Sequence, residues 1–233
     1  MPPVADSIAS RFHSLLTNIR EQEQRFNRAS GSVHLLAVSK TQAADRLREA
    51  RAAGARDFGE NYVQEALEKI AQLSADTPDI IWHFIGPIQS NKTRDLAAHF
   101  HWVHSIDRIK IIQRLQDQRP TDLPPLNICV QINLSNEDTK SGTSLQEART
   151  LCAAVSQMDR LCLRGLMAIP APCHDHEQQR AAFRPLAALF NELKQLYPTM
   201  DTLSMGMSDD FAAAIAEGST MVRIGTALFG RRN

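Results

Sequence analysis

The sequence has no excess of charge of either sign and no long hydrophobic run. Its 26 basic and 26 acidic residues cancel, so the chain has no one-signed field that would bind it to nucleic acid or to an anionic membrane surface. No stretch approaches the roughly 20 apolar residues that a membrane-spanning helix requires. We therefore expect no nucleic-acid or membrane partner and favour a small molecule as the ligand.

Cysteine is also scarce in this chain. The four cysteines include no Cys-x-x-Cys pair, and the first residues, MPPVADSIASRF, lack the basic region and apolar core of a secretory leader. These features predict reduced thiols and a cytoplasmic protein. The rest of the composition is ordinary, because 233 residues with 43% hydrophobic content suffice for one sizeable core, in one α/β barrel or in two small domains.

Apolar segments alternate with helical patterns along the whole chain. Apolar residues at helical spacing predict an amphipathic leading helix within residues 1–30. Short apolar or β-branched segments, which predict strands, then follow at 34–39, 56–60, 80–86, 101–106, 126–133, 163–170, 201–207 and 220–225. A helical pattern lies between each of these segments and the next. The leading helix is an additional element that precedes the first segment.

This alternation predicts parallel strands joined by right-handed crossovers, and eight such units close a barrel. We expect an α/β fold over residues 1–233: a single (β/α)8 TIM-like barrel domain with the leading helix packed on it. An open doubly wound sheet is the structural alternative, which periodicity does not exclude. Pro185 lies within a helical pattern, so that helix is expected either to kink or to start there.

The carboxyl ends of the strands in such a barrel meet in one site. The residues at or just past the predicted strand ends are Lys40, Asn61, His83, Met167, Ser204 and Arg223. A lone strand-end lysine more often extends into solvent, but here two glycine-containing loops, SMGMSDD and RIGTALFG, follow the last strands. Barrels of this kind often bind phosphate at those loops through backbone N–H groups.

The candidate phosphate ligands in these loops are Gly206, Ser208, Gly225 and Thr226. Ser208 is also expected to cap the helix that follows it, and capping alone is the alternative to a phosphate contact. For Gly225 and Thr226 the alternative is an ordinary turn.

A lysine at one end of a site and a phosphate cup at the other match pyridoxal 5′-phosphate (PLP), which carries an aldehyde and a phosphate on one ring. A desolvated lysine amine loses its proton more readily and can then form a Schiff base with the aldehyde. Arg223 could reach the pyridine nitrogen. Because a guanidinium stays protonated, this contact would leave the nitrogen unprotonated and the ring a weak electron sink.

Seven segments carry a resemblance to a known family: AVSKTQ, FGENYVQEALEK, WHFIGPIQSNK, VHSID, KSGTS, RGLMAI and LSMGMSDDFAAAIAEGSTMVRIGTALFG. From about residue 33 to its end, the sequence resembles the PLP homeostasis proteins, the YggS/PROSC family. The resemblance implies a barrel of the alanine racemase amino-terminal type that carries PLP as a Schiff base. The implied contacts are Lys40 to the aldehyde, Arg223 to the pyridine nitrogen, Asn61 beside the ring, and Ser208, Gly225 and Thr226 to the phosphate. Gln42 and Ala43 depart from the Lys and Pro of many relatives.

Two classes of function follow for a PLP barrel. The first, which we favour, is a monomeric carrier without substantial catalysis that serves PLP (vitamin B6) homeostasis and supplies apo PLP-dependent enzymes. The second is an amino-acid racemase, which needs a second base on the opposite face of the substrate. Alanine racemases take that base from a carboxyl-terminal β domain, whereas this sequence ends at GRRN with Tyr62 and Tyr197 in predicted helices. A sugar-phosphate enzyme with a Schiff-base lysine is a third reading.

Other polar residues have less specific patterns. CHDH at 173–176 has metal-ligand residue types at poor spacing, and His101 and His104 should point to opposite faces of a strand. His83 is expected either to flank the cofactor or to be a hydrogen-bonded core histidine. Lys140 either contacts a phosphorylated ligand or is solvated.

Overall fold

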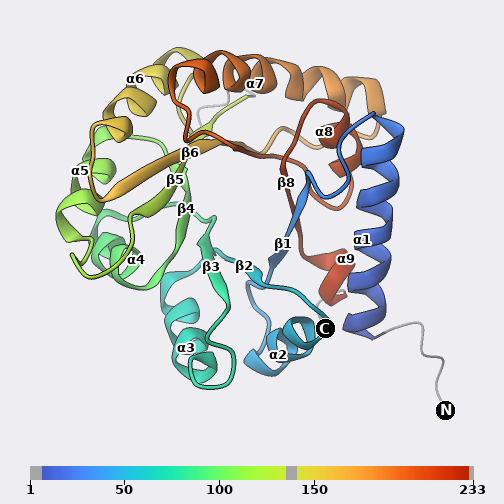
Figure 1. Ribbon diagram of the computed structural model, residues 1–233, viewed down its shortest axis with the longest axis horizontal. Coiled ribbons are helices and arrows are strands. Elements are labelled where there is room, and N and C mark those ends of the chain that lie inside the picture. The colour runs from blue at the N-terminus through green and yellow to red at the C-terminus, as the bar shows by residue number, and fades with distance from the viewer. Residues whose placement is uncertain (1–6, 135–140, 231–233) are drawn as a thin grey trace.

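The computed structural model describes residues 7–134 and 141–230, and Figure 1 shows strands in the middle with helices around them. Lys140 therefore lies outside the described residues. The parallel strands are hydrogen-bonded in chain order and close into a barrel, which confirms the predicted architecture and excludes the open sheet. The strands are β1 (His34–Val38), β2 (Asp57–Glu60), β3 (Ile81–Phe84), β4 (Trp102–Ile106), β5 (Leu126–Ile132), β6 (Leu161–Ala168), β7 (Thr202–Ser204) and β8 (Met221–Ile224).

Helices connect successive strands on the outside of the barrel (Figure 1). They are α1 (Ile8–Arg25), α2 (Ala44–Ala52), α3 (Val63–Leu73), the 3-10 helix η2 (Ser90–Lys92), α4 (Thr93–His99), α5 (Ile109–Gln118), α6 (Leu145–Ser156), α7 (His176–Leu196), α8 (Phe211–Ala216) and α9 (Thr226–Phe229). Within the described part of the chain, no helix combines the length and the hydropathy needed to cross a bilayer.

The leading helix α1 packs against α2, α8 and α9, beside the seam where the barrel closes (Figure 1). Arg11 of α1 donates a hydrogen bond to the Leu228 carbonyl at 2.7 Å, which ties α1 to the last helix. At the other end of α1, the buried Glu23 carboxylate accepts the N–H groups of Gly31 and Val33 at 2.9 and 2.7 Å. The segment that enters β1 is thus held by α1.

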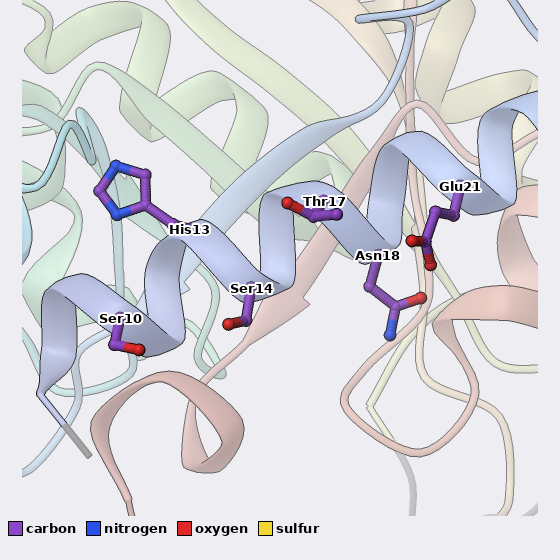
Figure 2. A pocket seen from close by; sticks show the side chains of 6 residues that line it. All are labelled: Ser10, His13, Ser14, Thr17, Asn18 and Glu21. Atoms are coloured by element: carbon purple, nitrogen blue, oxygen red, sulfur yellow. The ribbon is translucent and has the colours of Figure 1, made fainter. Parts of the chain in front are cut away.

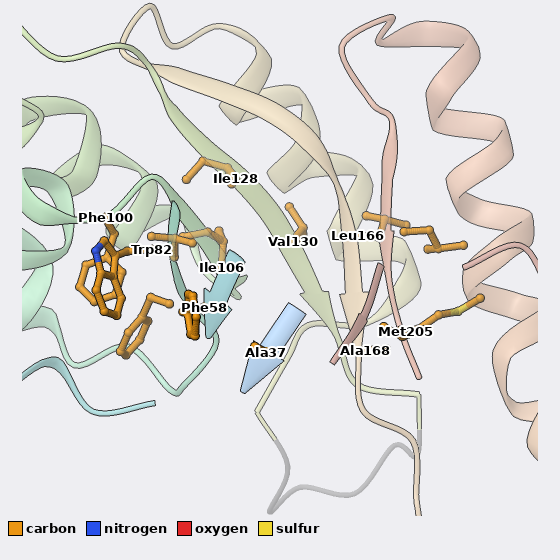
Figure 3. Close-up of a cluster of buried hydrophobic side chains, with 14 of the residues drawn as sticks. Ala37, Phe58, Trp82, Phe100, Ile106, Ile128, Val130, Leu166, Ala168 and Met205 are labelled. Carbon is orange, nitrogen blue, oxygen red and sulfur yellow. The ribbon is translucent and has the colours of Figure 1, made fainter. Parts of the chain in front are cut away.

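The strands bury both faces, and the two faces differ in character. Outward side chains such as Phe58, Trp82, Ile128 and Leu166 belong to the main hydrophobic cluster between strands and helices (Figure 3). Trp102, Cys129 and Met167 form a separate, smaller cluster. Near it lie four buried polar residues of the strands: His83, His104, Ser204 and Arg223. We place these polar side chains in the barrel interior, because alternate residues of a strand point to opposite faces.

The structure excludes one alternative for Pro185 and corrects the placement of the two tyrosines. Helix α7 runs from His176 to Leu196 with Pro185 inside it, so it does not start at the proline. Tyr62 and Tyr197 lie at helix ends, not within helices: Tyr62 is the residue before α3, and Tyr197 follows α7. Thr226, for which an ordinary turn was the alternative to a phosphate contact, is the first residue of the short helix α9.

Candidate functional site

Barrel closure places the first and the last strand side by side. β1 pairs with β8 in parallel, with Leu36 opposite Arg223 and Ala37 opposite Ile224. Lys40 lies two residues after the last residue of β1, and Gly225 follows directly after β8. A side chain on Gly225 would place its Cβ 3.3 Å from the Val38 carbonyl oxygen, so the glycine loop passes close against the end of β1. The predicted lysine and phosphate segments are therefore neighbours.

The backbone on both sides of Lys40 is fixed by a buried lysine on α3. Lys69 is 5% exposed and donates to the Ser39 carbonyl oxygen at 2.7 Å. The same ammonium group pairs with the carboxylates of Glu60 at 2.7 Å and Glu65 at 2.6 Å. Glu65 also accepts the N–H of Thr41, the residue after Lys40. We call Ser39, Glu60, Glu65 and Lys69 the lysine clamp.

The lysine clamp stabilises an unusual backbone turn. Thr41 has a φ of 64°, a left-handed conformation that is costly for a β-branched residue. Ser39 donates from its hydroxyl to Glu60 at 2.6 Å and from its N–H to the Gly59 carbonyl at 2.9 Å. Burial raises the pKa of the Glu60 carboxyl, while Lys69 and Ser39 act to lower it. The clamp thus holds the turn that presents Lys40.

Asn61 follows the carboxyl end of β2 and carries a buried oxygen without a partner among the described residues. This oxygen is Oδ1 of the side-chain amide. The backbone of Asn61 packs against Gly86, where an added Cβ would lie 2.3 Å from the Asn61 carbonyl oxygen. Only glycine fits at position 86. Because a buried amide oxygen without a donor is costly, Asn61 Oδ1 is suited to accept a bond from a ligand.

The loop after β7 is tightly packed against α8. Gly206 has a φ of 98°, and an added Cβ would lie 2.7 Å from the Ala214 Cβ. The Gly206 carbonyl accepts the N–H of Arg223 at 2.9 Å, which joins this loop to β8. The expectation that Ser208 caps the following helix is wrong. Helix α8 begins at Phe211 with Asp210 as its N-cap residue. The Asp210 carboxylate accepts the Met207 N–H at 2.6 Å and accepts no N–H of the first turn of α8.

Ser208 therefore lies in a turn two residues before the N-cap of α8, half-buried and not engaged in a cap. Thr226 is exposed at the first position of α9, and Gly225 is the N-cap of that helix. These residues belong to loops after adjacent strands, β7 and β8. Whether they hold a phosphate stays a prediction.

Arg223 is held inside the barrel at 4% exposure by neighbouring strands. Its Nη1 donates to the carbonyl and the hydroxyl oxygens of Ser204 at 2.6 and 2.9 Å, and its Nη2 donates to the Ala168 carbonyl at 2.8 Å. Burial lowers the pKa of Arg223 to about 10, although Asp210 and Cys129 act to raise it. The guanidinium is therefore a buried cation at neutral pH.

A line of hydrogen bonds continues from Arg223 across the barrel. Ser204 Oγ lies 3.1 Å from His104 Nδ1, and His104 Nε2 lies 2.9 Å from His83 Nδ1. His83 Nε2 lies 3.0 Å from an Asp57 carboxylate oxygen on β2. We call Asp57, His83, His104 and Ser204 the interior relay. Burial lowers the pKa of His83 and lowers that of His104 well below its ordinary value, so both imidazoles are neutral at pH 7.

His83 is thus a hydrogen-bonded core histidine, stacked on Trp102 with ring centroids 5.3 Å apart. A direct contact of His83 with a cofactor stays a prediction. Met167 is fully buried against Trp102 and Cys129, and its predicted ligand contact is likewise untested. In the CHDH segment, Asp175 caps α7 by accepting the Gln178 N–H at 2.8 Å. Across residues 7–134 and 141–230, no three His, Cys, Asp or Glu side chains are placed to hold a metal ion.

A surface hollow lies away from these residues, along the outer face of α1 (Figure 2). Its six lining side chains, Ser10, His13, Ser14, Thr17, Asn18 and Glu21, all come from this one helix. Because no second element forms a wall, the hollow cannot enclose a ligand. The strand ends remain the candidate site.

Comparisons with known proteins identify the family of this chain. Residues 13–233 match the family model described as alanine racemase, N-terminal domain. A pyridoxal phosphate homeostasis protein of Pseudomonas aeruginosa is 57% identical over 227 residues, which cover 97% of this chain and 96% of the relative. The chain belongs to the pyridoxal phosphate homeostasis protein family. The family member from Escherichia coli K12 is 52% identical over 229 residues, 98% of each chain.

A solved structure supports the same family. PipY of Synechococcus elongatus PCC7942, determined with PLP bound, is 38% identical to this chain. It superposes with a TM-score of 0.83 over 96% of this chain and 100% of its own. The resemblance to the PLP homeostasis proteins that the sequence motifs suggested is confirmed.

The lysine clamp as a unit, and Asp57 and His104 of the interior relay, were not among the site residues predicted from the sequence. Lys69 gave no signal, because it lies within an ordinary amphipathic helix pattern. His104 was considered only as a metal ligand. Polar residues at the centre of two successive apolar strands, His83 in IWHF and His104 in WVHSI, are the signal that could have identified an interior pair.

The clamp predicts a large loss of stability when Lys69 is replaced. Lys69→Met retains much of the side-chain volume but leaves two carboxylates facing each other without a cation. Breaking a buried ion pair on one side costs about 3 to 5 kcal/mol in the free energy of unfolding, which urea denaturation measures. The exposed Lys110→Met should change it by less than about 0.5 kcal/mol. Equal effects of the two changes would contradict the clamp.

The neutral histidines predict a loss of stability in acid. Unfolded imidazoles bind protons below about pH 6.5, whereas burial lowers the pKa of folded His83 and His104, so that they bind protons only at lower pH. The free energy of unfolding should therefore fall as the pH drops below about 6.5, by about 1.4 kcal/mol per pH unit for each proton. Urea denaturation at several pH values should show a shallower slope for His104→Gln than for the wild type. The exposed His13→Gln should keep the wild-type slope, and an unchanged slope in His104→Gln would be the contrary result.

Proposed function

We propose that this protein binds PLP through Lys40 and serves PLP homeostasis as a carrier, without substantial catalysis. The observation that carries the proposal is the adjacency of the clamped Lys40 turn, the glycine loop after β8 and the buried Arg223. The names of the curated relatives and the PLP in PipY support it. We further propose a monomeric, cytoplasmic protein that supplies apo PLP-dependent enzymes.

The residues at the strand ends fit PLP on their own chemistry. PLP, when bound, supplies an aldehyde that reacts with amines and a ring that can accept electrons. Lys40 provides the amine, and Asn61 Oδ1 is a buried acceptor without a partner among the described residues. Gly225 and Thr226 offer backbone N–H groups on the loop after β8, and Ser208 offers a hydroxyl on the loop after the adjacent strand β7, for a phosphate. Gly206 shapes the same loop through its left-handed backbone.

The names of the curated relatives favour a carrier over a racemase, and Arg223 is compatible with a carrier. The guanidinium remains protonated at neutral pH, so at the pyridine nitrogen it donates a hydrogen bond and gives up no proton. An unprotonated ring nitrogen is a poor electron sink, and reactions that form a carbanion are then slow. Such a site can hold an aldehyde without turning over an amine substrate.

The first test concerns Lys40. Lys40→Ala should fold but should show no visible absorption after incubation with PLP and removal of the unbound cofactor, because the other amine at the turn, Lys69, is held by Ser39, Glu60 and Glu65. Borohydride reduction of the wild-type protein with PLP, followed by mass spectrometry, should place the adduct on the Lys40 peptide. Lys92→Ala is the matched control and should bind like the wild type.

An adduct on Lys92 or Lys140 would overturn the assignment of Lys40. Catalysis is measured in the same preparations by incubation with L-alanine in deuterated water. The carrier should exchange the α-proton little faster than free PLP does. Formation of D-alanine at about 1 per second or more, lost in Lys40→Ala, would instead establish a racemase.

The second test concerns the phosphate. Removal of a hydrogen bond to a charged group costs about 1.5 to 3 kcal/mol, so Ser208→Ala should weaken PLP binding by about one to two decades. Pyridoxal, which lacks the phosphate, should bind almost unchanged. Equilibrium dialysis measures both dissociation constants, with Ser156→Ala on the surface of α6 as the control. Equal losses for PLP and pyridoxal would show that Ser208 does not contact the phosphate.

A further inference from the structure

The interior relay has a defined direction. An ionised Asp57 carboxylate can only accept, so His83 Nε2, 3.0 Å away, must carry a hydrogen and donate it. A neutral imidazole then leaves His83 Nδ1 as an acceptor, and His104 Nε2 must donate to it at 2.9 Å. His104 Nδ1 is left as an acceptor for the Ser204 hydroxyl. One protonation pattern therefore satisfies every bond.

The direction of these hydrogen bonds determines whether Ser204 presents an acceptor or a donor to Arg223. Because the Ser204 hydrogen points to His104, the Ser204 Oγ lone pairs are left for Arg223 Nη1 at 2.9 Å. The opposite tautomer of His104 would turn the Ser204 hydrogen toward the guanidinium, where two donors would face each other. The neutral state of both histidines, which their burial favours, preserves the pattern.

Arg223 retains donors for a ligand after these contacts. Its bonds to Ser204 and Ala168 use three of the five N–H groups of a guanidinium. Within the described residues the other two make no hydrogen bond to the protein. The orientation of the bonded groups therefore fixes where the remaining N–H groups point.

We propose that His104 is a positioning residue for Arg223, and that Asp57, acting through His83, sets the His104 tautomer that this role requires. The inference rests on the proposed function in one respect: Arg223 is taken to face the pyridine nitrogen of PLP. The relay then determines how well the site distinguishes a ring with nitrogen at that position from one without it.

Two substitutions of His104 separate positioning from packing. Glutamine reaches the Nε2 position and keeps a partner for His83, but it lacks the acceptor that faces Ser204. Asparagine places an amide oxygen near the Nδ1 position and keeps the acceptor for Ser204. Dissociation constants are measured for PLP and for its 1-deaza analogue, in which a C–H group replaces the ring nitrogen.

We expect His104→Gln to weaken PLP binding by about tenfold and to change binding of the 1-deaza analogue by less than about twofold. His104→Asn should bind PLP within about threefold of the wild type. Equal losses of both ligands in His104→Gln would show that His104 only supports the fold. Unchanged PLP binding would show that the relay does not act on Arg223.

A measurement without cofactor keeps the inference testable if the proposed function fails. Wild-type protein that binds no PLP would refute the proposed function, while nitrogen-15 NMR of the histidines at pH 7 would still test the relay. The spectrum should show hydrogen on Nε2 and none on Nδ1 for both His83 and His104. Asp57→Ala should disturb both signals, whereas the exposed Asp76→Ala should leave them unchanged. A hydrogen on His104 Nδ1 in the wild type would overturn the relay.

Discussion

The parallel pairing of β1 with β8 is the constraint on which the candidate site depends. It joins the first strand of the chain to the last, with Ala37 opposite Ile224, so that the loops after both strands leave the barrel side by side. Without this closure, Lys40 and Gly225 would lie at opposite edges of an open sheet. Helix α1 supports the seam, because it packs on α8 and α9 and its buried Glu23 binds the backbone that enters β1. The candidate site therefore depends on the closure of the barrel.

The two faces of the strands serve different purposes. The outer face provides the apolar contacts between barrel and helices, which supply most of the favourable free energy of burial (Figure 3). On the inner face, buried polar groups are costly unless each finds a partner. The interior relay meets this condition from Asp57 to Arg223. On our account, the cost of a polar interior is tolerated because it fixes one guanidinium in one orientation.

The barrel could be predicted from the sequence because its signal is repeated eight times and depends only on short-range periodicity. The site was harder to predict. Lys40 was identified from its place at a strand end, but the clamp joins α3 to the end of β1 across 30 residues of sequence, a contact that only the folded chain reveals. Ser208 failed as a cap because the Asp210 side chain bonds the Met207 N–H, which moves the helix start to Phe211. Such competition between neighbouring polar side chains has no periodic pattern.

The most direct test of the account is a crystal structure of the protein grown with PLP. We predict continuous electron density from Lys40 Nζ to the cofactor, the phosphate against Ser208, Gly225 and Thr226, and Arg223 within hydrogen-bond distance of the pyridine nitrogen. Density for the cofactor on another lysine, or a ring turned so that its phosphate lies away from the loop after β8, would contradict the claim that barrel closure builds the site.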